Sequence, residues 1–235
     1  MEPMVLYIFF FSLMIPGSFS ITFTFKNNCP STIWPGILTT PGKPLFPTSG
    51  FELATGALQS SDAPAGWGGR FWARTGCDGQ FTCTTGNCGP ALQCNGAGGS
   101  PPVTLAELNL NGDGGKDFYD VSLVDGFNLP VSITPKEVSC ISTTCSADVN
   151  SLCSPDLSVK GSDGRTIACK SACLAFNQPQ YCCSGEFASP DKCQPTNYST
   201  IFKNACPQAY SYAFDDKTSL FTCPVGANYI ITFCP

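Results

Sequence analysis

The sequence contains no histidine, and this absence removes the commonest general base near neutral pH. Histidine is also the usual partner of a serine or cysteine nucleophile, so triad chemistry of that kind is excluded. Zinc sites in secreted proteins usually include imidazole or carboxylate ligands, and the cysteines here are spread along the chain rather than set in paired C-x-x-C motifs. We therefore expect neither a metal ion nor a cofactor.

Charged residues and long apolar runs are scarce as well. Only 12% of the 235 residues are charged and the formal net charge is -5, whereas nucleic-acid binding requires clustered lysine and arginine. The one long apolar run, residues 5–15, is shorter than the roughly 20 residues that a helix needs to cross a membrane. We therefore expect no nucleic-acid partner and no transmembrane span.

The apolar run near the start is typical of a secretory signal peptide. Small side chains, Ser18 and Ser20, stand three and one positions before Ile21, as signal peptidase prefers. We therefore predict a signal peptide over residues 1–20 and a mature domain over residues 21–235. The end of the sequence shows no retention tetrapeptide and no hydrophobic tail for a lipid anchor, which favours export from the cell.

All 16 cysteines follow the predicted cleavage point, and an even number in an oxidising compartment predicts eight disulfides. The residues alone do not choose among about two million possible pairings. The mature length suits one hydrophobic core and one domain. The sequence Asn197-Tyr198-Ser199 is the only N-glycosylation sequon and makes Asn197 a candidate glycan acceptor.

Short alternating runs predict a mainly β protein. Apolar and polar residues alternate over residues 21–26 and again over residues 229–233, with the period of a half-buried strand. Between these ends, short runs are broken by glycine, proline, asparagine and aspartate, which favours an antiparallel β-sandwich core. Two cysteine-dense stretches predict disulfide-rich loop lobes, and we expect a short helix over residues 171–176 in the second. The expected division is a β core over 21–74, 102–145 and 207–235, a small lobe over 75–101 and a large lobe over 146–206.

One hairpin brings two acidic residues together. Glu107 and Asp120 lie on the less apolar face of two predicted strands joined by a glycine-rich turn centred between Asp113 and Gly114, a register that places them opposite each other. Opposed residues have Cβ atoms about 4.5–5.5 Å apart, and like charges so placed are destabilising. Such a pair raises one carboxyl pKa and leaves the other group ionised, as in glycoside hydrolysis.

Residues 79–88, with the following Cys94, resemble the signature of the thaumatin-like proteins, the plant pathogenesis-related family 5. Asn87 stands where that family has aspartate. The resemblance extends over the whole mature chain through residues 69–75, 101–107, 120–128 and 206–212. It implies a thaumatin-like β fold and secretion into the plant apoplast, and we expect a monomer.

The resemblance also implies a disulfide pairing. In this pairing the loop between Cys77 and Cys83 is shorter than the family norm. The implied bridges are Cys29–Cys234, Cys77–Cys83, Cys88–Cys94, Cys140–Cys223, Cys145–Cys206, Cys153–Cys169, Cys173–Cys182 and Cys183–Cys193.

In the family an arginine, a glutamate and three aspartates line an acidic cleft between the β body and the large lobe. The matching positions here are Arg70, Glu107, Asp120 and Asp125, together with Asp215 or Asp216, of which we favour Asp215. The alternative is that the arginine only neutralises buried acids and that the later aspartates are turn residues. Aromatic residues beside these acids suit sugar rings but are more often core: Phe71, Trp72, Tyr119, Phe127, Tyr210 and Tyr212.

What the resemblance implies about function is a secreted defence protein that binds β-1,3-glucan of the fungal cell wall and has antifungal activity. An alternative is a weak endo-β-1,3-glucanase in which Glu107 is the proton donor and an aspartate such as Asp120 is its partner. A further alternative is a protein-interaction or enzyme-inhibitor role.

Overall fold

The computed structural model describes residues 20–136 and 139–235, so the predicted signal peptide before Ser20 lies outside the described residues. Ten of the strands form two five-stranded sheets. The first sheet has the order β3 (Leu58–Ala63), β1 (Ile21–Asn27), β12 (Tyr229–Phe233), β7 (Val131–Pro135), β8 (Thr143–Cys145). The second has the order β11 (Phe221–Pro224), β6 (Lys116–Ser122), β5 (Leu105–Asn109), β4 (Gly68–Thr75), β2 (Ile33–Thr39). The predicted mainly β class is confirmed.

The core between the sheets is rich in aromatic side chains. Phe23 of β1 and Phe71 of β4 are fully buried and their ring centroids lie 5.1 Å apart, so residues of opposite sheets meet directly. Trp67 stacks on Phe71 at 4.9 Å. Full burial of one such side chain stabilises the fold by about 1.5–3 kcal/mol. Because side chains alternate between the two faces of a strand, every second residue of the strand points into the core.

One strand pair departs from the expected antiparallel arrangement. Strand β1 pairs with β12 in parallel, whereas the other pairings within the two described sheets are antiparallel. Almost the whole chain connects these two strands, so no tight hairpin constrains their relative direction. The disulfide Cys29–Cys234 joins the ends of the same two strands.

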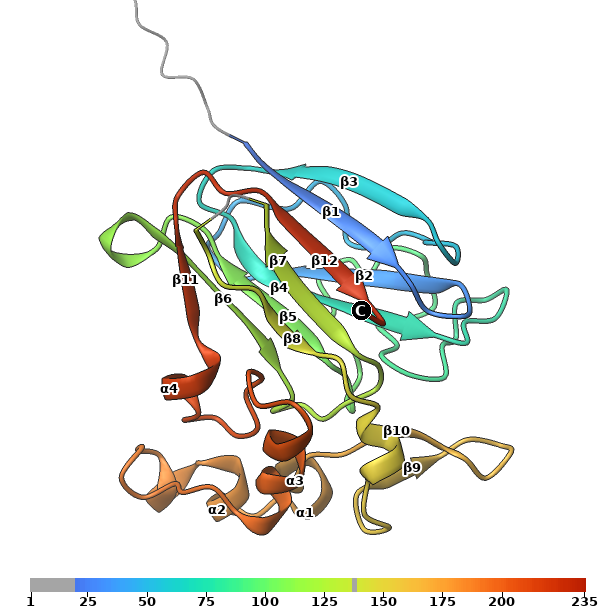
Figure 1. Cartoon of the computed structure of the whole chain (residues 1–235). Coiled ribbons are helices and arrows are strands. Elements are labelled where there is room, and N and C mark those ends of the chain that lie inside the picture. The colour runs from blue at the N-terminus through green and yellow to red at the C-terminus, as the bar shows by residue number, and fades with distance from the viewer. Residues whose placement is uncertain (1–19, 137–138) are drawn as a thin grey trace, which may run out of the picture.

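The large lobe lies at one end of the sandwich, where Figure 1 shows the helices gathered. It contains a small hairpin, three short helices and two 3-10 turns: β9 (Ser158–Lys160), β10 (Thr166–Cys169), α1 (Ala172–Phe176), α2 (Pro179–Cys182), α3 (Asn197–Ala205), η2 (Val149–Leu152) and η3 (Gly185–Phe187). The predicted helix over residues 171–176 is α1, and the Ser171 hydroxyl caps it by accepting from the Leu174 N–H at 3.2 Å.

All eight disulfides have the pairing that the resemblance implies. Every cysteine of the chain is used, which suits an extracellular protein. None of the helices in the described residues combines the length and apolar character needed to cross a membrane.

The small lobe is held to the β body by a buried arginine. Arg74 of β4 has no exposed surface, and its guanidinium donates to the carbonyl oxygens of Trp34 at 3.0 Å, Ala91 at 3.0 Å and Leu92 at 2.6 Å. Burial lowers its pKa. Because Ala91 and Leu92 belong to the lobe and Trp34 to β2, this one side chain connects the two parts.

Candidate functional site

The predicted hairpin register is confirmed. Strands β5 and β6 pair with Glu107 directly opposite Asp120. The connecting turn includes the 3-10 segment η1 (Asp113–Gly115), in which Gly114 and Gly115 have φ values of 63° and 64°, a region that favours glycine. The turn closes with a hydrogen bond from the Gly112 N–H to the Lys116 carbonyl oxygen at 2.7 Å.

A buried carboxylate fixes this hairpin to the core. Asp117 is 1% exposed and accepts hydrogen bonds from the Asn111 N–H and the Tyr229 hydroxyl, both at 2.9 Å. Burial raises the pKa of Asp117, and the two hydrogen bonds oppose that rise. Because Tyr229 belongs to β12 of the other sheet, these bonds hold the hairpin against the core and resist slippage of its register.

Arg70 of β4 extends the acidic pair into a row across three strands, because it lies opposite Glu107 on the other side. Its Nη1 atom lies 3.9 Å from Glu107 Oε1 and 3.9 Å from Asp125 Oδ2. All three side chains are between 37% and 43% exposed, so these long ion pairs contribute little to stability. The guanidinium is shared between two carboxylates and remains accessible to a ligand.

The opposite wall comes from the segment after the large lobe. The Tyr210 N–H donates to the Val121 carbonyl oxygen and the Leu123 N–H donates to the Tyr210 carbonyl oxygen, both at 2.9 Å, so this segment continues the sheet beyond β6. The Tyr210 hydroxyl donates to Asp216 Oδ1 at 3.0 Å. Asp216 is exposed and begins the short helix α4 (Asp216–Ser219).

These elements surround an open hollow of about 400 Å³ that is lined by four carboxylates, one guanidinium and one phenol. We call it the acidic hollow. The side chains are Glu107, Asp120, Asp125, Asp216, Arg70 and Tyr210.

Asp216, and not the favoured Asp215, lines the acidic hollow. Asp215 is 9% exposed and accepts from the Ser211 N–H at 3.0 Å, the Ser211 hydroxyl at 2.9 Å and the Thr218 hydroxyl at 3.1 Å. Lys203 Nζ lies 2.8 Å from Asp215 Oδ2. The preference for Asp215 is therefore wrong, because an ammonium group and two hydroxyls hold this carboxylate away from the hollow.

Lys203 joins helix α3 to the wall of the hollow. Besides the contact with Asp215, its ammonium group donates to the carbonyl oxygens of Pro207 at 3.1 Å and Ala209 at 3.0 Å and to the Ser219 hydroxyl at 2.9 Å. These partners flank the segment that carries the Tyr210 and Asp216 side chains. The sequence gives no local signal for this network, because Lys203 lies in a different element from its partners.

The electrostatics of the acidic hollow differ between its two central carboxylates. Burial raises the pKa of Glu107, Arg70 opposes the rise and Asp125 adds to it. Burial raises the pKa of Asp120 well above its usual value, and the carboxylates of Glu107 and Asp216 add to the rise. Asp120 Oδ1 is buried and has no hydrogen-bond partner among the described residues. Asp120 is therefore the carboxyl group that most strongly favours its protonated form.

Most aromatic neighbours of these acids belong to the core, as expected from their residue types. Phe71, Trp72, Tyr119 and Phe127 have no exposed surface. Tyr210 lines the acidic hollow, and its pKa is raised by burial, by its hydrogen bond to the Asp216 carboxylate and by the surrounding acids.

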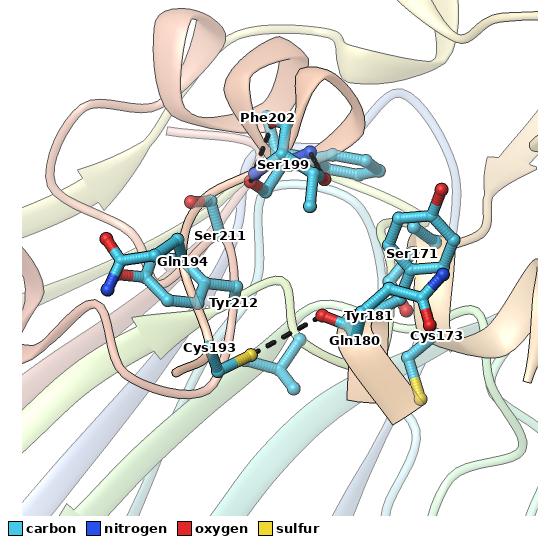
Figure 2. Close-up of a pocket in the computed structure, with 13 residues that line it drawn as sticks. Ser171, Cys173, Gln180, Tyr181, Cys193, Gln194, Ser199, Phe202, Ser211 and Tyr212 are labelled. Atoms are coloured by element: carbon cyan, nitrogen blue, oxygen red, sulfur yellow. Dashed lines mark hydrogen bonds between the residues drawn. The ribbon is translucent and has the colours of Figure 1, made fainter. Parts of the chain in front are cut away.

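A second pocket lies between the large lobe and the β body and is too small for a sugar. Figure 2 shows Tyr212 and Gln194 on one side of it and Tyr181 and Ser171 on the other, with Ser199 of α3 closing it. Its volume is about 20 Å³, which is room for about one water molecule. This pocket is part of the packing between the lobe and the β body.

The predicted glycan acceptor lies at the start of α3. The Asn197 side chain is exposed, whereas Ser199, the third residue of the sequon, is 7% exposed. Its hydroxyl accepts from the Thr196 N–H at 2.8 Å and forms half of a capping box. Modification of Asn197 stays a prediction.

Comparison with known proteins identifies the family. A model described as "Thaumatin family" matches residues 27–235. Thaumatin-like protein 1 from Pyrus pyrifolia is 58% identical over 226 residues, covering 93% of each chain. A Prunus avium protein named glucan endo-1,3-beta-glucosidase is 54% identical over 230 residues, covering 95% of this chain and 94% of its own. Pathogenesis-related protein 5 from Arabidopsis thaliana is 57% identical over 219 residues, covering 91% and 90%. The chain belongs to the thaumatin family.

Proposed function

We propose that this protein binds β-1,3-glucan in the acidic hollow. The observation that carries the proposal is that four carboxylates, a guanidinium and a phenol from separate segments line one open hollow of about 400 Å³. Carboxylates accept hydrogen bonds from sugar hydroxyls, and the Arg70 guanidinium donates them. The Tyr210 side chain adds an aromatic surface beside the polar groups, a combination that suits sugar rings.

The relatives support a glycan ligand and a defence role. The Prunus avium relative is named for a glucan-cleaving activity and the Arabidopsis thaliana relative is named as pathogenesis-related. We propose accordingly that the protein is secreted into the apoplast, binds fungal cell walls and has antifungal activity. Eight disulfides suit such an oxidising, protease-rich environment.

The test is a sedimentation assay on insoluble β-1,3-glucan. Glu107→Gln and Asp216→Asn remove charges from the hollow with little change in volume, and we expect both to reduce the bound fraction severalfold. Asp113→Asn removes the same charge from the exposed hairpin turn and is expected to bind as wild type. Wild-type binding by both hollow variants would contradict the proposal.

A second candidate function is slow hydrolysis of the same polymer, and the opposition of Glu107 and Asp120 favours it. Directly opposed Cβ atoms are about 4.5–5.5 Å apart, which allows the short carboxyl separation of about 5–5.5 Å that retaining glycosidases use. Because Arg70 opposes the rise in the Glu107 pKa, Asp120 is the better proton donor and Glu107 the better nucleophile. These roles are the reverse of those expected from the sequence.

Release of reducing ends, measured in the sedimentation assay, separates binding from hydrolysis. If the protein is a glucanase, Asp120→Asn and Glu107→Gln lose cleavage even at saturating glucan, and the first sugar product keeps the anomeric configuration of the substrate. If wild type binds glucan and releases no reducing ends, the protein is a binding module.

A further inference from the structure

Another open hollow lies at the β2 edge of the second sheet, outside the site described above. Its lining consists of residues 37–39 of β2, residues 45–49 of the loop that follows, and Gln93, Asn95 and Gly96 of the small lobe. Its volume is about 410 Å³. We call it the loop hollow. Small-molecule sites measure about 300–1,000 Å³, so the loop hollow is large enough for a ligand.

The loop hollow and the acidic hollow meet at one pair of residues. Leu38 of β2 lines the loop hollow and lies directly opposite Arg70 of β4, which lines the acidic hollow. Directly opposed residues of neighbouring strands point to the same face of a sheet. The row continues from Arg70 through Glu107 and Asp120. Because neighbouring strands lie about 4.7–4.9 Å apart, the row is about 14–15 Å long and joins the two hollows.

Glycines shape the passage over Leu38 and Arg70. A Cβ atom on Gly68 would lie 3.4 Å from Lys43 Cε, so the stem of this lysine lies along β4 next to Arg70. On the small lobe, a Cβ atom on Gly98 would lie 3.6 Å from Leu38 Cδ2. Lys43 and the small lobe therefore border the passage, and Leu38 and Arg70, which both keep exposed surface, form its floor.

The loop beside the hollow holds a leucine in an exposed position. Leu45 is 81% exposed, the highest value among the large apolar side chains of the described residues. Its neighbour Phe46 is buried, with its ring centroid 5.2 Å from that of Trp67, and Pro44 and Pro47 restrict the backbone on both sides. Leu45 is therefore held in place without being packed, so a ligand that covers it would lose little affinity to ordering of the loop.

The lining of the loop hollow suits an uncharged sugar. No charged side chain of the described residues lines it, whereas the acidic hollow has five. Leu38, Leu45 and Pro47 offer apolar surface to the C–H face of a sugar ring, and Thr48 and Asn95 carry polar groups that can bond its hydroxyls. An apolar surface with a few polar groups is the usual composition of a ligand site.

We propose that the loop hollow is a second subsite for the β-1,3-glucan of the acidic hollow, and that one chain crosses from one hollow to the other over Arg70 and Leu38. This inference rests on the proposed function and names its ligand more closely, as a glucan long enough to fill both hollows. A short oligomer fills the acidic hollow alone and lacks the contacts with Leu45. Affinity should therefore rise with chain length until both hollows are filled.

The experiment is a calorimetric titration with a short β-1,3-linked glucose oligomer that fills one hollow and a long one that fills both. We expect wild type to bind the long oligomer at least about tenfold more tightly than the short one. Leu45→Ser should weaken binding of the long oligomer about threefold to tenfold and leave the short one unchanged, because the apolar contact is lost. Leu45→Trp, which offers a large apolar surface again, should bind the long oligomer at least as tightly as wild type.

Two further variants serve as controls. Leu58→Ser removes a leucine that is 63% exposed in β3 of the other sheet, and it should bind both oligomers as wild type. Glu107→Gln should weaken both oligomers, because both occupy the acidic hollow. The thermal midpoints of Leu45→Ser and Leu58→Ser should stay close to that of wild type, because exposed substitutions change stability by about 0.5 kcal/mol or less.

Several outcomes would overturn the inference. Equal affinity of wild type for the two oligomers, or an equal effect of Leu45→Ser and Leu58→Ser, would show that the loop hollow binds no glucan. If Glu107→Gln weakens both oligomers while Leu45→Ser weakens neither, the inference fails and the proposed function stands. If Leu45→Ser weakens the long oligomer while Glu107→Gln changes nothing, the acidic hollow is not the glycan site and the proposed function fails with the crossing chain. An apolar dye that binds wild type, is lost in Leu45→Ser and is not displaced by the long oligomer would assign the loop hollow to an apolar ligand instead.

Discussion

Replacement of Lys203 by methionine tests whether helix α3 positions the wall of the acidic hollow. The substitution keeps an unbranched apolar stem but removes the ammonium group, which lies 2.8 Å from Asp215 Oδ2 and donates to two carbonyl oxygens. The side chains of Lys203 and Asp215 are 25% and 10% exposed, so the Asp215 charge would lose its partner in a largely buried place.

The expected loss of stability can be worked from this geometry. Removal of one member of a fully buried ion pair destabilises by about 3–5 kcal/mol. Here Asp215 keeps its three hydrogen bonds from Ser211 and Thr218 and Lys203 is partly solvated, so we expect about 2–3 kcal/mol. For a domain of this size the thermal midpoint would fall by about 5–10 °C. Lys217→Met, which removes an exposed lysine of α4, is the matched control and should change the midpoint little.

The assay is a double-mutant cycle with Lys203→Met, Asp215→Asn and the double variant, measured by denaturant unfolding with the disulfides intact. We expect a coupling free energy of about 1–2 kcal/mol, because each single change removes the same interaction. Glucan binding should fall in Lys203→Met, since the segment that carries Asp216 and Tyr210 loses its attachment to α3. A coupling near zero would refute the ion-pair argument, and unchanged glucan binding would refute the positioning argument.

Three further outcomes follow from other parts of the molecule. Because the pKa of Asp120 is raised in the folded state, wild type should lose stability as pH rises through the pKa of the folded protein. The variant Asp120→Asn should be more stable than wild type by about 0.5–1 kcal/mol at neutral pH and no more stable in strong acid. A series of unfolding midpoints measured at different pH values checks the sign of this difference. Arg74→Met should destabilise the folded protein by about 3 kcal/mol, because three carbonyl oxygens lose their hydrogen-bond donor. It should speed amide hydrogen exchange in residues 88–94 more than in β1, and an equal increase in exchange across the chain would contradict this. Removal of Cys29–Cys234 by a double alanine substitution should cost about 5 kcal/mol by the chain-entropy estimate for a loop of 205 residues, and a denaturant midpoint equal to that of wild type would contradict the estimate.

The hairpin of the site was predictable from the sequence because its signals are local. The alternation of apolar and polar residues along β5 and β6 places Glu107 and Asp120 on the same face of the sheet. The glycines of the turn fix the register between the two strands. The disulfide pairing was available only through the family resemblance, since spacing alone leaves the pairing open. The pairing direction of β1 and β12 depends on the whole intervening chain, and no local pattern specifies it.

The choice between Asp215 and Asp216 could not be made from the sequence for a similar reason. The two residues are adjacent, and both suit a turn or the first residues of a helix. Their roles differ because Lys203, which lies in another element, binds Asp215, while the Tyr210 hydroxyl binds Asp216. A tertiary contact of this kind leaves no periodic pattern in the neighbouring residues.

The position of β12 has a consequence for biosynthesis. Strand β12 follows the other strands of its sheet in the sequence, and it is an interior strand with β1 on one side and β7 on the other. Until β12 has been synthesised, the nascent polypeptide would present two unpaired strand edges on which other chains can aggregate. Premature termination shortly before Tyr229 should therefore yield insoluble product rather than a weakened protein, and productive folding of this sheet has to await the synthesis of β12.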